Sequence, residues 1–318
     1  MLKKIAGVFC IIAIMMFATS FKIAEPVKPV NTTSPKQSKL RTIVIDAGHG
    51  GKDFGAAGKY SYEKNVALAI ALKLQTTLQQ AMPDVKIVMT RTTDIFQKPQ
   101  EKASIANNAK GDLFICIHCN SVPKVRHTEV IGHKTQTYYT GKGKKRKKHT
   151  RQVPTYRVWY SQNPVKGTET YIWAAHKNED KELAMRENES LYIDSTMLQQ
   201  VGDFDPDSPE GRIRASLRTQ QLFNRSANLA LDVEDELDKV GRIVNGAKQR
   251  QVGIWVLQAT AMPSILVETG YISTPDDEDY LNSVDGQQEI CDCITKAVEK
   301  YKASLETNSF PNVSDSTQ

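Results

Sequence analysis

The sequence lacks a long apolar run, has few cysteines and contains no compact metal-binding motif. Its longest apolar stretch, Ile5 to Ala18, has about 14 residues, whereas a membrane-spanning helix needs about 20. Only four of the five cysteines lie beyond residue 20, and we expect these four to be small buried thiols. No His-Glu-x-x-His motif and no internal repeat occurs anywhere. Any metal site must therefore be assembled from distant parts of the chain.

The two ends of the chain are unlike its middle. Residues 1–20 resemble a signal peptide, because a positive Met1-Leu-Lys-Lys4 precedes the apolar run and the small residues of Ala18-Thr-Ser20 follow it. The alternative is an uncleaved anchor. We expect residues 21–40, which are polar and proline-rich, to be a flexible linker, and residues 304–318 to be a disordered tail. The predicted folded unit is residues 41–303, in an exported protein.

The charge of the chain is concentrated in one segment. The formal charge of +6 falls to +4 when the lysines of residues 1–20 are removed. Lys142 to Lys148 then contributes six basic residues, within a polar segment at about 122–166 that has no clear periodicity. Such a run is usually a solvated loop, and the alternative is a patch that binds an anionic polymer or a membrane surface. Export argues against nucleic acid as a partner.

Strand and helix patterns alternate along the folded unit. Short β-branched runs predict strands, and apolar stripes at i+4 predict helices. The predicted strands span residues 41–47, 85–90, 112–118, 168–173, 252–257 and 264–267. The predicted helices span residues 61–81, 101–109, 179–200, 214–240, 276–281 and 289–301. This order predicts a single α/β domain with a mixed, mostly parallel sheet and helices on both faces.

Three ionisable residues follow apolar runs: His49, His118 and Glu268. Open α/β sheets bind ligands at the carboxyl ends of their strands, so we expect these side chains to meet at one edge. A lone histidine at a strand end is more often a structural residue. Two histidines and a carboxylate together nevertheless suggest a metal site.

A catalytic zinc site needs three protein ligands, an open position for water and a nearby carboxylate that moves protons. Glu63, at the start of the first predicted helix, returns to the same sheet edge as the strand ends. His49, Glu63 and His118 can thus supply the ligands for one zinc ion, which leaves Glu268 for proton transfer.

Four motifs occur in an order that resembles a known family. They are Asp46-Ala-Gly-His-Gly-Gly51, Tyr62-Glu-Lys-Asn65, Asp112-Leu-Phe-Ile-Cys-Ile-His-Cys-Asn-Ser121 and Pro263-Ser-Ile-Leu-Val-Glu-Thr-Gly-Tyr-Ile-Ser273. Together they resemble the zinc-dependent N-acetylmuramoyl-L-alanine amidases, the type 3 family of peptidoglycan hydrolases, over about residues 41–301. The resemblance implies that His49, Glu63 and His118 bind zinc and that Glu268 is the catalytic carboxylate.

The same resemblance implies a reaction and a place. The expected reaction is hydrolysis of the amide between N-acetylmuramic acid and the L-alanine of peptidoglycan stem peptides, during wall remodelling or daughter-cell separation. The expected location is the periplasm or the cell wall. A zinc peptidase acting on stem peptides and an inactive wall-binding regulator are the alternatives. An activator protein, and a lid between Glu179 and Arg214, are further possibilities that the sequence leaves open.

The chain also departs from the family pattern. Cys119 stands where the family usually has a small residue, although a side chain next to His118 on a strand points to the opposite face. Pro99 and Lys102 replace the leucine and arginine that are usual there, which puts local contacts in doubt. The largest departure is the segment of about 45 residues at 122–166.

Overall fold

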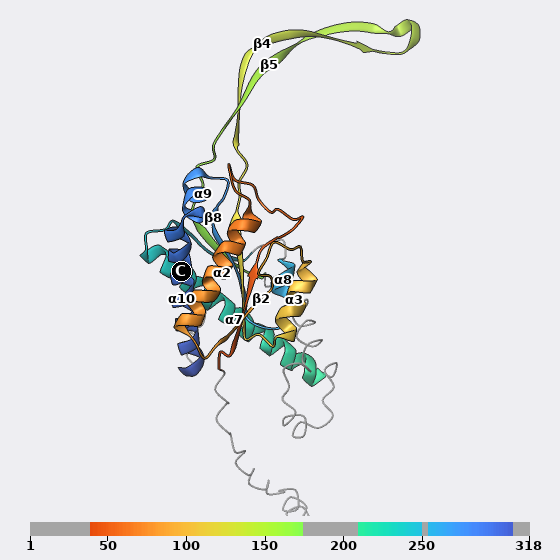
Figure 1. Ribbon diagram of the computed structural model, residues 1–318. Coiled ribbons are helices and arrows are strands. Elements are labelled where there is room, and N and C mark those ends of the chain that lie inside the picture. The colour runs from red at the N-terminus through yellow and green to blue at the C-terminus, as the bar shows by residue number, and fades with distance from the viewer. Residues whose placement is uncertain (1–38, 174–208, 250–253, 308–318) are drawn as a thin grey trace, which may run out of the picture. The chain divides into compact units, whose positions relative to one another are not determined.

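The computed structural model describes residues 39–173, 209–249 and 254–307 (Figure 1). These described residues belong to one compact unit. The predicted signal peptide, almost all of the linker, the predicted helix at 179–200 and the main part of the predicted lid lie outside the described residues. Within the described residues, no helix combines the length and the apolar character that a membrane crossing requires.

A six-stranded sheet with the order β2-β1-β3-β8-β6-β7 forms the centre of the domain. β1, β2, β3 and β8 are parallel, whereas β6 and β7 are parallel to each other and antiparallel to β8. The strand bounds are β1 Thr42–Ala47, β2 Lys86–Met89, β3 Leu113–Asn120, β6 Thr168–Ile172, β7 Val244–Gln249 and β8 Ser264–Tyr271. This arrangement confirms the predicted mixed, mostly parallel sheet.

Helices cover both faces of the sheet, as predicted (Figure 1). On one face, apolar residues of α2, α10 and α7 pack with Ile43, Ile45 and Ile115. On the other face, residues of α3 and α8 pack with Val44, Phe114 and Leu266. The helix bounds are α2 Glu63–Ala81, α3 Pro99–Asn108, α7 Pro209–Lys239, α8 Trp255–Ala259, α9 Pro275–Asn282 and α10 Val284–Thr307. The central strands are apolar on both faces because both faces are covered.

The basic segment is not a loop, which corrects the simpler of the two predictions. It forms a β-hairpin of β4 (Val125–Thr140) and β5 (Lys147–Ser161), joined by the short helix η1 (Gly143–Lys145). Its tyrosine, threonine and valine residues favour extended backbone. Both faces of the ribbon are exposed, so the alternation of apolar and polar residues that identifies a half-buried strand is missing.

Three elements near the carboxyl end also differ from the prediction. The strand predicted at 252–257 is wrong where the structure describes it, because Val256 and Leu257 are buried in the one-turn helix α8. A short apolar run does not distinguish a strand from a buried helix. β7 was not predicted, because Val-Asn-Gly-Ala-Lys-Gln has no apolar periodicity and lies at the sheet edge. α10 continues to Thr307 and takes in the first residues of the predicted tail.

Candidate metal centre

His49 lies in a tight turn directly after β1, and its backbone has a φ angle of 57°. This left-handed conformation is uncommon for a residue with a side chain and has to be held by its surroundings. Arg91 holds it: the buried guanidinium donates to the carbonyl oxygens of Ala47 at 3.0 Å, Gly48 at 2.7 Å and Lys64 at 2.8 Å. A Cβ atom on Gly48 would lie 2.6 Å from the His118 ring, so only glycine fits there.

Glu63, the first residue of α2, bridges the two histidines. Its Oε1 atom lies 2.8 Å from Nδ1 of His118, and its Oε2 atom lies 3.1 Å from Nε2 of His49. Backbone N–H groups of Cys119 and Ala56 also donate to this carboxylate. Burial raises the pKa of Glu63, but its hydrogen bonds and attraction to His118 and His49 outweigh burial and hold the pKa well below its usual range. The predicted ligands His49, Glu63 and His118 therefore do come together.

Asp53 was missed by the sequence analysis. Its Oδ2 atom lies 2.9 Å from Nδ1 of His49, on the side of the ring that faces away from Glu63. Burial lowers the pKa of His49, but Glu63 and then Asp53 outweigh burial and raise it. With a carboxylate at Nδ1, the ring presents Nε2 to the centre. The signal in the sequence was an aspartate four residues after the histidine, within the same glycine-rich turn.

Glu268 lies inside β8, and His118 lies inside β3, because both strands run further than predicted. The two residues are partners in the parallel β3–β8 register, so their side chains share one face of the sheet. Glu268 is buried, and Glu169 of β6 is its partner on the other side. Glu169 in turn accepts hydrogen bonds from Asn120, Tyr171, Tyr271 and Lys248. The predicted catalytic carboxylate thus lies one strand away from a predicted ligand.

Glu278 of α9 holds the segment that leads into α2. Its carboxylate accepts the backbone N–H groups of Lys59 at 2.7 Å, Tyr60 at 2.9 Å and Ser61 at 2.9 Å, and the Ser61 hydroxyl at 2.8 Å. A Cβ atom on Gly58 would lie 2.2 Å from this carboxylate, so glycine permits the close approach. No local pattern predicts this contact, because 217 residues separate Ser61 from Glu278.

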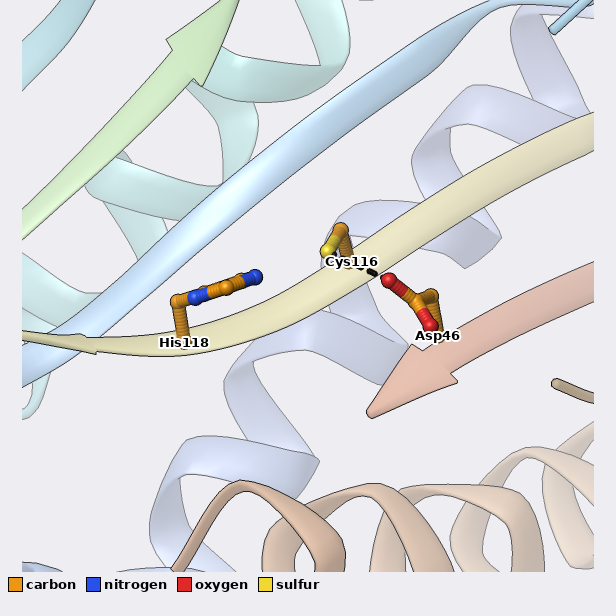
Figure 2. Close-up of side chains that lie close together, drawn as sticks. All are labelled: Asp46, Cys116 and His118. Atoms are coloured by element: carbon orange, nitrogen blue, oxygen red, sulfur yellow. Dashed lines mark hydrogen bonds between the residues drawn. The ribbon is translucent and has the colours of Figure 1, made fainter. Parts of the chain in front are cut away.

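A second group of donor atoms includes His118. Asp46, Cys116 and His118 each have one such atom within 4.8 Å of the others, and Figure 2 shows Cys116 and His118 on the same side of β3. Asp46 is already paired with Lys102, whose Nζ atom lies 2.8 Å from Oδ1, and it accepts the thiol hydrogen of Cys116 at 2.9 Å. Burial raises the pKa of Cys116 well above its usual range. We therefore assign this group a structural role.

Cys119 does not compete for the centre. Its thiol belongs to the apolar core of the α2 face, on the side of β3 opposite Cys116, as predicted. Burial raises the pKa of this thiol well above its usual range, which keeps it protonated. Lys102, another departure from the family pattern, forms the buried ion pair with Asp46.

The donor atoms of His49, Glu63 and His118 fit a divalent metal ion. One atom from each residue lies within 4.8 Å of the other two, and the three come from a turn, a helix start and a strand. Two imidazoles and one carboxylate form a ligand set that is typical of catalytic zinc. A carboxylate behind one imidazole and a second carboxylate on the adjacent strand complete the arrangement.

Comparison with known proteins points to one family. A family model described as N-acetylmuramoyl-L-alanine amidase matches residues 43–300. The chain is 28% identical over 267 residues to the amidase AmiC of Escherichia coli O6:H1, covering 82% of this chain and 52% of that protein. It is also 28% identical over 260 residues to a putative N-acetylmuramoyl-L-alanine amidase of Buchnera aphidicola, covering 81% of this chain and 95% of that protein. The chain thus spans about half the length of the AmiC relative.

Solved structures agree with the fold. The crystal structure of an N-acetylmuramoyl-L-alanine amidase from Clostridium difficile 630 superimposes with a TM-score of 0.52 at 23% identity, covering 84% of this chain and 99% of that chain. The amidase Ami1 from Mycobacterium smegmatis gives a TM-score of 0.50 at 15% identity, covering 84% of this chain and all of that chain. The match of the family model over residues 43–300 decides the assignment. The chain belongs to the N-acetylmuramoyl-L-alanine amidase family.

Proposed function

We propose that this protein hydrolyses the amide bond between N-acetylmuramic acid and the L-alanine of peptidoglycan stem peptides, with one zinc ion held by His49, Glu63 and His118. The observation that carries the proposal is the convergence of these three donors within 4.8 Å, with Glu268 in register beside His118. Membership of the amidase family supports the same reaction and the same substrate.

Different residues of the chain have different roles in this reaction. When bound, zinc supplies a Lewis acid that polarises the scissile carbonyl and lowers the pKa of water to about 7. Glu268 accepts a proton from the attacking water and delivers it to the leaving amine of L-alanine. Asp53 keeps His49 in one orientation and leaves its Nε2 atom for the metal. Arg91 fixes the turn that carries His49.

We also propose that the protein works outside the cytoplasm, in the periplasm or the cell wall. The support is the pattern of residues 1–20, which has the charged start, the apolar run and the small residues of a signal peptide. Peptidoglycan as the substrate agrees with that location. Removal of these residues is testable by sequencing the amino terminus of the protein recovered from the envelope, where a start near Phe21 is the expected result.

Product analysis separates the proposed reaction from its alternatives. Purified peptidoglycan is incubated with the zinc-loaded protein, and the released material is identified by mass spectrometry. Intact stem peptides that begin with L-alanine are the expected products. Shortened stem peptides would instead identify a zinc peptidase. No release at all, from protein with a full complement of zinc, would favour an inactive wall-binding regulator.

A further inference from the structure

The β4–β5 hairpin is exposed along its length. Its strands pair from Val125 opposite Ser161 to Thr140 opposite Lys147, with one bulge between Val130 and Gly132. At about 3.3 Å per residue, the 16 residues of β4 give a ribbon about 50 Å long (Figure 1). An isolated two-stranded ribbon is only marginally stable in water. Packing against the domain therefore does not explain why the chain has such a long exposed ribbon.

Contacts between cross-strand neighbours give the ribbon its order. His127 stacks on Trp159 with ring centroids 5.3 Å apart, and Tyr138 stacks on His149 at 5.2 Å. Arg157 pairs with Glu129 at 3.2 Å, in the part of the ribbon nearer the domain. Because these contacts lie within the ribbon itself, the hairpin has a defined surface to offer a partner.

The positive charge of the hairpin is larger than the negative charge of the rest of the chain. Between Val125 and Ser161 there are ten lysines and arginines and one glutamate, a formal charge of +9. The whole chain carries +6, so the remainder carries −3. Six of the ten cations lie within Lys142–Lys148, and none of these six forms an ion pair with another described residue. The charge of the tip is therefore not balanced by ion pairs within the described residues and is open to an anion from outside the chain.

The arrangement of the cations indicates the shape of that anion. Lys147 and Arg151 lie on one face of the ribbon, and Lys148 lies on the other, as the strand register requires. A membrane presents a plane, which can meet only one face. Residues 141–152 also contain no aliphatic side chain that would enter a bilayer. A flexible chain can follow cations around both faces.

Two arginines near the tip are held over tyrosine rings. The Arg146 guanidinium lies 4.0 Å from the Tyr139 ring centroid, and that of Arg151 lies 5.6 Å from the Tyr138 centroid. Such stacking orients the planar guanidinium, which binds a phosphate through two parallel hydrogen bonds. Lysines flank Arg146 in the sequence and add positive charge, which an ammonium group directs less strictly than a guanidinium does. The combination suits a partner with many closely spaced phosphates.

We infer that the β4–β5 hairpin binds a linear phosphodiester polymer of the cell envelope and holds the enzyme beside its substrate. This role goes beyond hydrolysis of the stem-peptide amide and uses none of the residues of the metal centre. It also accounts for the exposed ribbon, the uncompensated charge and the absence of an apolar tip.

Binding to labelled polymers tests the inference directly. The full chain is titrated into fluorescent poly(glycerol phosphate) and polyphosphate, and binding is followed by anisotropy at several salt concentrations. The triple variant Lys144→Gln/Lys145→Gln/Lys147→Gln should bind at least about tenfold more weakly, with a shallower salt dependence. The matched triple variant Lys59→Gln/Lys86→Gln/Lys296→Gln, at exposed lysines of the domain, should bind within about twofold of the unaltered chain.

Additional variants and ligands identify the partner and exclude misfolding as the cause of any loss of binding. Replacing Lys144, Lys145 and Lys147 by arginine keeps the charge and should keep the binding. Equal losses in the two glutamine triple variants would overturn the inference. So would equal or tighter binding to phosphatidylglycerol vesicles or to single-stranded DNA of matched charge. Anisotropy requires no turnover, so failure of the proposed reaction, seen as no product from a muramyl peptide with the unaltered chain, is a separate result.

Discussion

Asp53 accepts a hydrogen bond from His49, with 2.9 Å between Oδ2 and Nδ1, on the side of the imidazole away from Glu63. The contact fixes the His49 ring, although the Asp53 side chain is not one of the three donors that converge in the candidate metal centre. Carboxylates in this position raise the basicity of a ligating histidine and keep its ring in place.

The first prediction concerns this contact. Asp53→Asn should weaken zinc binding by about 10- to 100-fold, because the ring loses a charged partner that orients it. Competition with a chromophoric chelator measures the affinity. Asp84→Asn is the control, since Asp84 is an exposed aspartate that pairs with Lys302. Equal zinc affinities in the Asp53 and Asp84 variants would show that Asp53 has no part in metal binding.

A second prediction concerns stability. Glu278→Gln should lower the free energy of unfolding by about 2 kcal/mol at pH 7, because one amide cannot replace a carboxylate that accepts four hydrogen bonds. Urea unfolding measures the difference. Asp276→Asn, at an exposed residue of the same helix, should change stability by less than about 0.5 kcal/mol.

The stabilising effect of Glu278 should also depend on pH. Burial raises the pKa of this carboxyl, but the N–H groups of Tyr60, Lys59 and Ser61 outweigh burial, so its pKa is lowered from 4.5. A group whose pKa is lowered by folding stabilises the fold above its unfolded pKa and loses that effect as the pH falls through its folded pKa. The gap between the unaltered chain and Glu278→Gln should therefore narrow below about pH 4.5. A gap that stays constant down to pH 3 would contradict this account.

The proposed metal ligands could be named from the sequence, whereas the distant side chains that hold the surrounding elements could not. His49, Glu63 and His118 each occur in a local pattern, namely a glycine-rich turn, a helix start and a buried strand. Those patterns depend on backbone geometry within a few residues. Glu278 and Lys102 act through contacts that depend on how distant elements pack. A carboxylate on a polar helix or a lysine on another helix looks like an ordinary solvated residue until the fold places it.

The hairpin shows the limit of periodicity in another way. Val130, Tyr156 and Trp159 are exposed, as are the basic residues between the two strands. A hydrophobic pattern marks a strand only when one face is buried. A ribbon exposed on both faces gives no such pattern, and its tyrosines and threonines were the only indication of extended structure. The hairpin from Val125 to Ser161 lies within the segment singled out at about 122–166, but its conformation was not predicted.

A third prediction concerns the buried ion pair of Asp46 and Lys102. Lys102→Met should destabilise the fold by about 3 to 5 kcal/mol, because it leaves the Asp46 carboxylate buried without its charged partner. Thermal or urea unfolding measures the loss. Lys86→Met, at an exposed lysine of β2, should cost less than about 0.5 kcal/mol.

The double variant Asp46→Asn/Lys102→Met separates pairing from packing. It removes both charges, so it should recover at least half of the stability that Lys102→Met loses. If the double variant is as unstable as the single one, the lysine contributes through its aliphatic chain rather than through its charge.

The fourth prediction assigns proton transfer to Glu268. Glu268→Gln keeps the size of the side chain but removes the group that accepts a proton, so the rate of amide hydrolysis should fall by about 10²- to 10⁴-fold. Zinc content should stay at one ion per chain, because the proposed ligands are His49, Glu63 and His118. His118→Ala provides the contrast, since it should lose both zinc and activity. Hydrolysis of a soluble muramyl peptide, followed by the release of the peptide amine, measures the rates. Full activity of the zinc-loaded Glu268→Gln protein would show that Glu268 does not accept the proton. The next residue to test would then be its register neighbour Glu169, the other buried carboxylate on that face of β6 and β8.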